Sequence, residues 1–141
     1  MIVLDTNVVS EFMRLTRQPE VIAWLDDQPT STLFVTAITE AEILRGIALL
    51  PHGRRRRALT AAAERAFGVL FDERILSFDS EAARAYAAIA VSRRAVGHPI
   101  SQADCQIAAI ARSRGASVAT RDVKGFRDCG IDVVNPWLHL E

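Results

Sequence analysis

The chain of 141 residues is long enough for one domain with a sizeable hydrophobic core and leaves little room for a second. Half of the residues are hydrophobic and 24% are charged, a balance that excludes intrinsic disorder, a collagen-like repeat and a coiled-coil rod. The 17 basic and 17 acidic side chains cancel, so binding of nucleic acid would have to depend on a local basic patch.

Short apolar segments alternate with longer segments of helical periodicity along the whole chain. Strands are predicted at 2–4, 32–36, 75–78, 117–120 and 131–134. Helices are predicted at 7–14, 19–25, 37–50, 54–70, 80–97 and 101–115. This order is typical of an α/β fold, and we expect a single domain over 1–141 with three α/β/α layers around a mostly parallel sheet of four to five strands.

Cellular location is predicted from the cysteines and from the absence of apolar runs. Cys105 and Cys129 lie far apart without the spacing of a zinc site, and two thiols without a disulfide framework suit the reducing cytoplasm. No apolar run approaches the roughly 20 residues of a membrane span. The first residues lack a basic leader and are interrupted by Asp5, so no signal peptide and no membrane partner are expected.

Four acidic residues map to one edge of the predicted sheet. Asp5 follows the first strand and Asp122 follows the fourth, while Glu42 and Asp104 lie early in the helices that begin near 37 and 101. Right-handed crossovers bring the carboxyl ends of parallel strands to the same edge, where open α/β sheets bind ligands. Asp79 falls at this edge too, but a normal helix start follows it, so we interpret Asp79 as an N-cap.

The mutual repulsion of these carboxylates indicates a bound cation. Two carboxylates about 4 Å apart repel by roughly 4 kcal/mol at an effective dielectric constant near 20. Protonation or a hard divalent cation relieves this repulsion, and an all-oxygen ligand set suits Mg²⁺ or Mn²⁺. Such a cation can activate water against a phosphodiester, so Asp5, Glu42, Asp104 and Asp122 are predicted to be both metal ligands and catalytic residues.

Helix capping is the alternative role for these acids. Residues 39–42 match a capping box and residues 101–104 come close to one. Against capping, Asp104 shares a helical side with Ile107, and Glu42 shares one with Leu49. A carboxylate that leans into an apolar surface needs a partner, which a metal site would provide.

Polar and basic neighbours complete the predicted site. Hydroxyl and amide groups at Thr6, Asn7, Ser10 and Thr120 could bind ligands or water, or could cap helices instead. The candidates for contact with phosphate groups are Arg121, Lys124 and Arg127. The run 54–57 consists of four arginines at a helix start, where cations oppose the helix dipole, and its role stays open between phosphate binding and a solvated surface.

Four sequence motifs resemble those of PIN-domain nucleases, and most closely the VapC and FitB type of toxin. They are, in order, VLDTNVVSEFMR, ITEAEILRGIALLP, ISQADCQIAAIA and VATRDVKGF. The resemblance implies an endoribonuclease toxin that depends on Mg²⁺, with Mn²⁺ able to substitute. It also implies a homodimer and a cognate DNA-binding antitoxin of the VapB or FitA kind.

The resemblance also assigns roles to individual residues. Asp5 and Asp104 would be the most direct metal ligands, and Glu42 and Asp122 would complete the acidic set. Asp122 stands where the family varies between Asp and Asn, and Thr120 matches a hydroxyl residue often found before that acid. The RNA target does not follow from the resemblance.

The two N-terminal helices offer apolar side chains on which an antitoxin tail could dock. These side chains are Phe12, Met13, Val21, Trp24 and Leu25. Ordinary packing in the core is the alternative, because a parallel sheet needs helices on both faces.

Two other functional classes share parts of this pattern. A haloacid-dehalogenase-like phosphatase also places an Asp nucleophile after its first strand, but it requires a second Asp where Asn7 stands. A non-enzymatic phosphoacceptor signalling domain would draw support from Asp79 and Lys124, but it requires paired acids after the first strand, and Asp5 stands alone there.

Overall fold

The computed structural model describes residues 1–140 and contains five strands and six α-helices in that range. The strands are β1 (Ile2–Leu4), β2 (Leu33–Thr36), β3 (Ile75–Leu76), β4 (Ser117–Ala119) and β5 (Val133–Val134). The helices are α1 (Thr6–Met13), α2 (Pro19–Asp26), α3 (Ala37–Ala48), α4 (Arg54–Arg65), α5 (Ser80–Ala95) and α6 (Gln102–Ser113). Short helical turns occupy Thr30–Thr32, Ala66–Leu70, Lys124–Phe126 and Pro136–Leu138.

The five strands form one parallel sheet in the order β3-β2-β1-β4-β5, which confirms the predicted fold class. β1 lies at the centre, with Val3 opposite Phe34 of β2 and Val118 of β4. The chain therefore builds outward from β1 to β3 on one side and to β5 on the other. This order puts the ends of β1 and β4, and the residues that follow them, beside each other.

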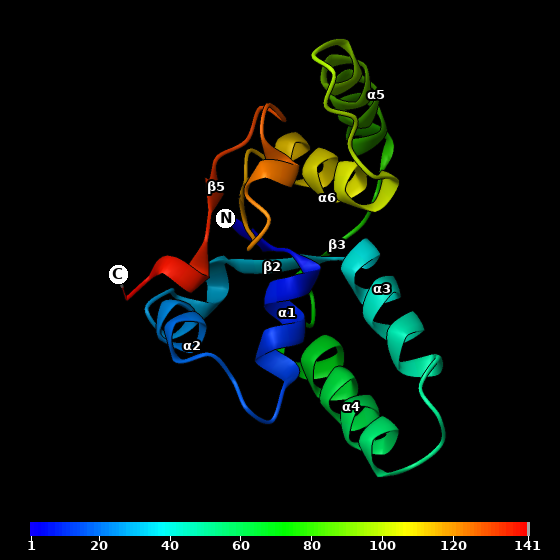
Figure 1. Ribbon diagram of the computed structural model, residues 1–141, viewed down its shortest axis with the longest axis vertical. Coiled ribbons are helices and arrows are strands. Elements are labelled where there is room, and N and C mark those ends of the chain that lie inside the picture. Colours follow the sequence, from blue (N-terminus) through cyan, green and yellow to red (C-terminus); the bar gives the residue numbers. More distant parts are fainter. Residues whose placement is uncertain (141) are drawn as a thin grey trace.

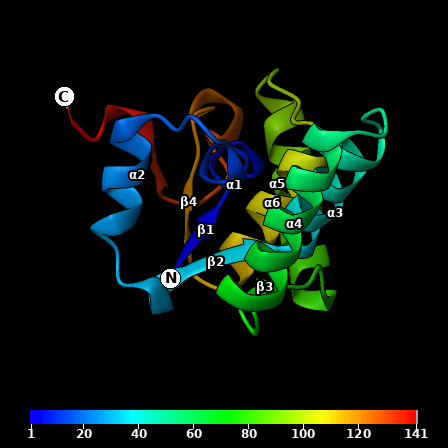
Figure 2. The ribbon, with the colours of Figure 1, turned by 90° about the horizontal axis from the view of Figure 1, so that it is seen from below.

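Helices cover both faces of the sheet and give three layers (Figure 1 and Figure 2). α5 and α6 pack on one face, where Ile89 and Ile107 bury against Val118. α1, α2, α3 and α4 contribute to the core on the other face, where Val8 and Ile43 pack in the same cluster. Because both faces are covered, the strands carry apolar residues on both sides.

The N-terminal helices contribute less free apolar surface than predicted. Val21 and Trp24 are buried in the core of the second face, so the core-packing alternative holds for both. Phe12, Met13 and Leu25 are half-buried and keep part of their surface accessible. The prediction of an antitoxin surface that includes Trp24 is therefore wrong, because α2 needs this side chain to pack on the sheet.

Several predicted boundaries move by a few residues. Asp5, not Asn7, is the N-cap of α1, and the predicted helix 54–70 changes from an α-helix to a π-helical turn at Ala66. The predicted cap at Asp79 is confirmed, because its carboxylate accepts a hydrogen bond from the amide of Ala82 at 2.9 Å. No helix within residues 1–140 has the length and hydropathy needed to cross a bilayer.

Candidate active site

The carboxyl ends of β1 and β4 meet at the centre of the site. The amide of Asp5 donates to the carbonyl of Ala119 at 2.9 Å, which locks the end of β1 to the end of β4. Asp5 then begins α1, and Thr120 continues from β4 toward Asp122. The predicted convergence of these segments at one sheet edge is therefore present in the structure.

Asp5 is a buried carboxylate held in a network of donors. Its side chain accepts hydrogen bonds from the Thr6 amide at 2.8 Å, the Thr120 hydroxyl at 2.7 Å and Nδ2 of Asn7 at 3.2 Å. Only 4% of Asp5 is exposed, and this burial raises the pKa of its carboxyl from 3.8 to about 6 despite those donors. The charges of Asp104 and Glu42 also raise this pKa, so the three carboxylates lie close enough to interact.

Glu42 lies at the site through α3, and it caps no helix. The N-cap of α3 is Thr36, whose hydroxyl accepts from the Thr39 amide at 3.1 Å, so the capping box predicted at 39–42 does not form. The Thr6 hydroxyl donates to Oε1 of Glu42 at 2.6 Å and lies 3.0 Å from the hydroxyl of Thr39. Glu42 and Leu49 are both exposed, so the expectation that Glu42 leans into an apolar surface is wrong.

Asp104 lies in the first turn of α6, half-buried above a helical side that includes the fully buried Ile107. The Asp104 amide donates to the hydroxyl of Ser101 at 3.2 Å, so Ser101 supplies the N-cap. Burial raises the pKa of the Asp104 carboxyl, and the charges of Asp122 and Glu42 raise it further. Asp104 is thus electrostatically coupled to acids on two other segments.

Asp122 is exposed and caps the turn that follows it. Its Oδ1 accepts a hydrogen bond from the amide of Gly125 at 3.1 Å, and its own amide donates to the Thr120 hydroxyl at 3.0 Å. Since Thr120 also donates to Asp5, Asp122 and Asp5 are linked through one hydroxyl group.

An open cavity of about 480 Å³ brings three of the four acids together. It is lined by Asp5, Thr6, Asn7, Ser10, Glu11, Arg14, Glu42, Asp104, Arg121 and Trp137. Asp122 stays outside this lining and connects to it through Thr120. The cavity joins the carboxylates to guanidinium groups, as a site for a phosphodiester and a cation would require.

Sequence reasoning missed Glu11 and Arg14 in this cavity. Glu11 is 5% exposed; its carboxylate accepts from the Gln18 amide at 2.7 Å and pairs with Arg14 at 3.2 Å. The signal was present in the sequence, because Asn7, Ser10, Glu11 and Arg14 recur at helical spacing and form a polar stripe on an otherwise apolar helix.

The predicted RNA-contact residues are distributed unevenly around the cavity. The guanidinium of Arg121 lies 5.3 Å from the ring centroid of Trp137, and this cation–π contact holds the Arg121 side chain at the rim of the cavity. The Arg121 amide donates to Oδ1 of Asn7 at 3.3 Å. Lys124 and Arg127 are exposed on the segment after Asp122 and line no part of the cavity.

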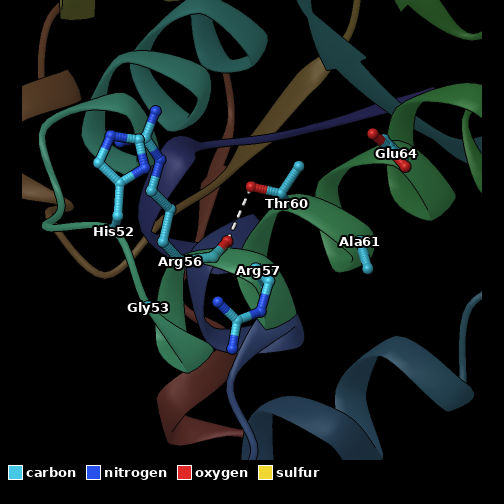
Figure 3. A pocket seen from close by; sticks show the side chains of 7 residues that line it. All are labelled: His52, Gly53, Arg56, Arg57, Thr60, Ala61 and Glu64. Atoms are coloured by element: carbon cyan, nitrogen blue, oxygen red, sulfur yellow. Dashed lines mark hydrogen bonds between the residues drawn. The ribbon is translucent and has the colours of Figure 1, made fainter.

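The arginine run 54–57 lies at a separate cavity of about 340 Å³ (Figure 3). This second cavity is lined by His52, Gly53, Arg56, Arg57, Thr60, Ala61 and Glu64, none of which lines the carboxylate cavity. Arg56 donates to the carbonyl of Leu50 at 3.2 Å. The run therefore belongs to the distal end of the α3–α4 pair and not to the acidic site.

The residues present fit a hard divalent cation by their chemistry. The acids are coupled oxygen donors: burial and the neighbouring carboxylates raise the pKa of Asp5 and of Asp104, and the charge of Arg93 offsets part of this effect at Asp104. Within residues 1–140, no three His, Cys, Asp or Glu side chains converge closely enough to hold one ion as they stand.

Comparison with known proteins identifies close relatives over the whole chain. Residues 2–131 match the PIN domain. The chain is 42% identical over 137 residues to VapC ribonuclease Y4jK of Sinorhizobium fredii, a match that covers 97% of this chain and 98% of the relative. It is 41% identical over 137 residues to toxin FitB of Neisseria gonorrhoeae, a match that covers 97% of this chain and 99% of the relative.

A solved structure agrees with these relatives. The structure of FitAB bound to the IR36 DNA fragment superimposes with a TM-score of 0.92 at 42% identity, covering 100% of this chain and 98% of that chain. The match sets aside the phosphatase and the phosphoacceptor alternatives. Fold, site geometry and relatives agree: the chain belongs to the PIN-domain family, among relatives named VapC ribonuclease and toxin FitB.

Proposed function

We propose that this chain is a divalent-metal-dependent endoribonuclease that hydrolyses RNA phosphodiester bonds, acting as the toxin of a toxin–antitoxin pair. The observation that carries the proposal is the buried Asp5 carboxylate, which interacts with Glu42 and Asp104 beside an open cavity. Full-length relatives named ribonuclease and toxin support the same activity. Mg²⁺ is the expected cofactor and Mn²⁺ should substitute, because the donors are all carboxylate oxygens.

Each acid has a distinct role in this proposal. Asp5 and Asp104 hold the cation most directly, Glu42 completes the site from α3, and Asp122 contributes from the segment after β4. When bound, the cation supplies Lewis-acid stabilisation of the phosphodiester and a water of lowered pKa. Thr120 holds Asp5 in place through its hydroxyl group.

The remaining polar side chains position the acids and the RNA. Asn7 donates to Asp5, and Thr6 donates to Glu42, so both fix carboxylate orientation before substrate arrives. Arg121 stacks on Trp137 at the rim and is placed to bind a backbone phosphate. Lys124 and Arg127 extend the positive surface past Asp122 and are the weaker candidates.

Regulation by a partner follows from the relatives. FitB is a toxin, and the FitAB structure contains a DNA fragment, so we infer a cognate, DNA-binding antitoxin of the FitA or VapB kind for this chain. The family resemblance also supports a homodimer, action in the cytoplasm and a single domain over 1–141.

Expression in a bacterial host tests the proposal. The wild-type chain should arrest growth and produce new RNA 5′ ends at defined sites, detected by sequencing total RNA after induction. Asp104→Asn, which keeps the side-chain volume and removes one charge, should accumulate as folded protein without either effect. Growth arrest and new 5′ ends of equal strength from Asp104→Asn would refute the assigned site.

A further inference from the structure

Arg93 of α5 is a buried cation that lies outside the cavity of the acidic site. It is 5% exposed, and no carboxylate within residues 1–140 lies within salt-bridge distance of its guanidinium. Removing a guanidinium from water is costly unless every N–H group is satisfied. Such a group needs a structural reason to be in the core.

Two nitrogens of the Arg93 guanidinium, Nε and Nη1, donate to backbone carbonyls from two segments. Its Nε donates to the carbonyl of His98 at 2.6 Å, and its Nη1 donates to the carbonyls of Gly125 and Arg127, both at 2.8 Å. The same Nη1 lies 3.7 Å from Sγ of Cys129. Arg93 thus clamps the end of α5 onto the segment that follows Asp122.

That segment has few other fixed points. Val123, Lys124 and Arg127 are exposed, and Phe126 is the single side chain of 122–127 that enters the core. The Gly125 amide donates to the Asp122 carboxylate, while the Gly125 carbonyl accepts from Arg93. Gly125 therefore contacts Arg93 through its carbonyl and Asp122 through its amide.

Gly125 also restricts where the acid can lie. A Cβ atom at this position would collide with the carboxylate of Asp122. The carboxylate therefore packs directly on the Gly125 backbone, and any shift of that backbone moves it. The Asp122 amide donates to the Thr120 hydroxyl, and this hydroxyl donates to Asp5, so the same shift also affects the hydrogen bond to Asp5.

We propose that Arg93 is a positioning residue for the nuclease site, which fixes the Asp122–Arg127 segment so that the Asp122 carboxylate faces the cation position. The effect on catalysis rests on the proposed function, whereas the effect of Arg93 on the position of the Asp122–Arg127 segment does not. The fork geometry of the guanidinium is essential, because it binds carbonyls of two segments at once. A lysine at 93 would keep the charge but lack that geometry.

The structural part is tested by amide hydrogen exchange on the metal-free protein. Arg93→Lys should lose protection at the amides of Gly125 and Arg127, while α6 keeps its protection. Gly125→Ala leaves Arg93 intact and displaces the acid directly, so it serves as a second variant if Arg93→Lys fails to fold. Arg94→Lys, on an exposed neighbour, is the matched control and should leave all protection unchanged.

The functional part is tested by Mn²⁺ affinity, measured by calorimetry. Arg93→Lys and Gly125→Ala should each weaken Mn²⁺ binding about 10- to 100-fold, as loss of groups that orient ligands typically does. In an Asp122→Asn background, Arg93→Lys should have no further effect, because the acid it positions is absent.

The outcomes separate the two proposals. Unchanged exchange at Gly125, or equal weakening of Mn²⁺ binding with and without Asp122, would overturn the role of Arg93. A wild-type chain that binds Mn²⁺ but cleaves no RNA would refute the proposed function, and the exchange result would still decide how Arg93 acts.

Discussion

Replacing Asp5 with asparagine should stabilise the metal-free protein while it abolishes cleavage. Burial raises the pKa of this carboxyl from 3.8 to about 6, a shift of about two units. At 1.36 kcal/mol per unit, keeping Asp5 ionised in the folded state at neutral pH costs about 3 kcal/mol. The hydrogen bonds from Thr6 and Thr120 lower the pKa and are already included in this shift, so removal of the charge by asparagine should give a net gain of about 3 kcal/mol at pH 7.

The pH dependence of this gain has a definite sign. Because the folded pKa of Asp5 is raised, its contribution to stability is fully favourable below pH 3.8 and is lost as the pH rises through about 6. The advantage of Asp5→Asn should therefore be absent near pH 4 and complete at pH 7. For a chain of 141 residues a gain of about 3 kcal/mol corresponds to about 10 °C in the midpoint of thermal unfolding.

Thermal unfolding of both proteins in chelator at pH 4 and pH 7, with RNA cleavage measured on the same samples, tests this reasoning. Asp79→Asn is a suitable control, because Asp79 is an N-cap outside the acidic site. A lower midpoint for Asp5→Asn than for wild type at pH 7, or a gain that is equal at both pH values, would refute the assigned burial cost.

Three further predictions concern the metal, the RNA surface and the core. Mn²⁺ at about 100 times its Kd should stabilise the wild type by about 2.7 kcal/mol. Asp104→Asn should lose most of this gain in a thermal-shift titration, and an equal shift in both proteins would remove Asp104 from the ligand set. If residues 54–57 bind phosphates, changing all four arginines to glutamine should make RNA affinity less dependent on salt. The slope of log K against log salt concentration should fall by about 0.7 for each phosphate that is no longer neutralised, and an unchanged slope would assign the arginines to a solvated surface. Trp24→Ala should destabilise the fold by about 3–5 kcal/mol in denaturant unfolding, and a near-native midpoint would contradict its place in the core.

The strands and the acidic edge could be predicted because local signals determine them. Apolar runs bounded by turns placed all five strands, and the rule that parallel strands end at one edge placed Asp5, Glu42, Asp104 and Asp122 on neighbouring segments. These inferences need only periodicity and connection handedness, which the sequence carries directly.

Other features depend on packing that sequence spacing alone does not reveal. The match to a capping box at 39–42 was misleading because Thr36 lies one turn earlier and caps α3 instead. For Trp24 the sequence left a docking surface and core packing open, and the packing of α2 on the sheet decides for the core. The role of Arg93 depends on two carbonyls more than 30 residues away, a contact that only the folded chain creates.

The most direct test of the account is the rate of RNA cleavage by purified, chelator-treated protein as Mn²⁺ or Mg²⁺ is added back. Wild-type protein should be inactive in chelator and should recover cleavage in step with metal binding. Asp5→Asn should stay inactive at every metal concentration while remaining folded. Cleavage in excess chelator, or full activity of Asp5→Asn, would contradict the claim that the coupled carboxylates at this sheet edge hold the cation that drives RNA hydrolysis.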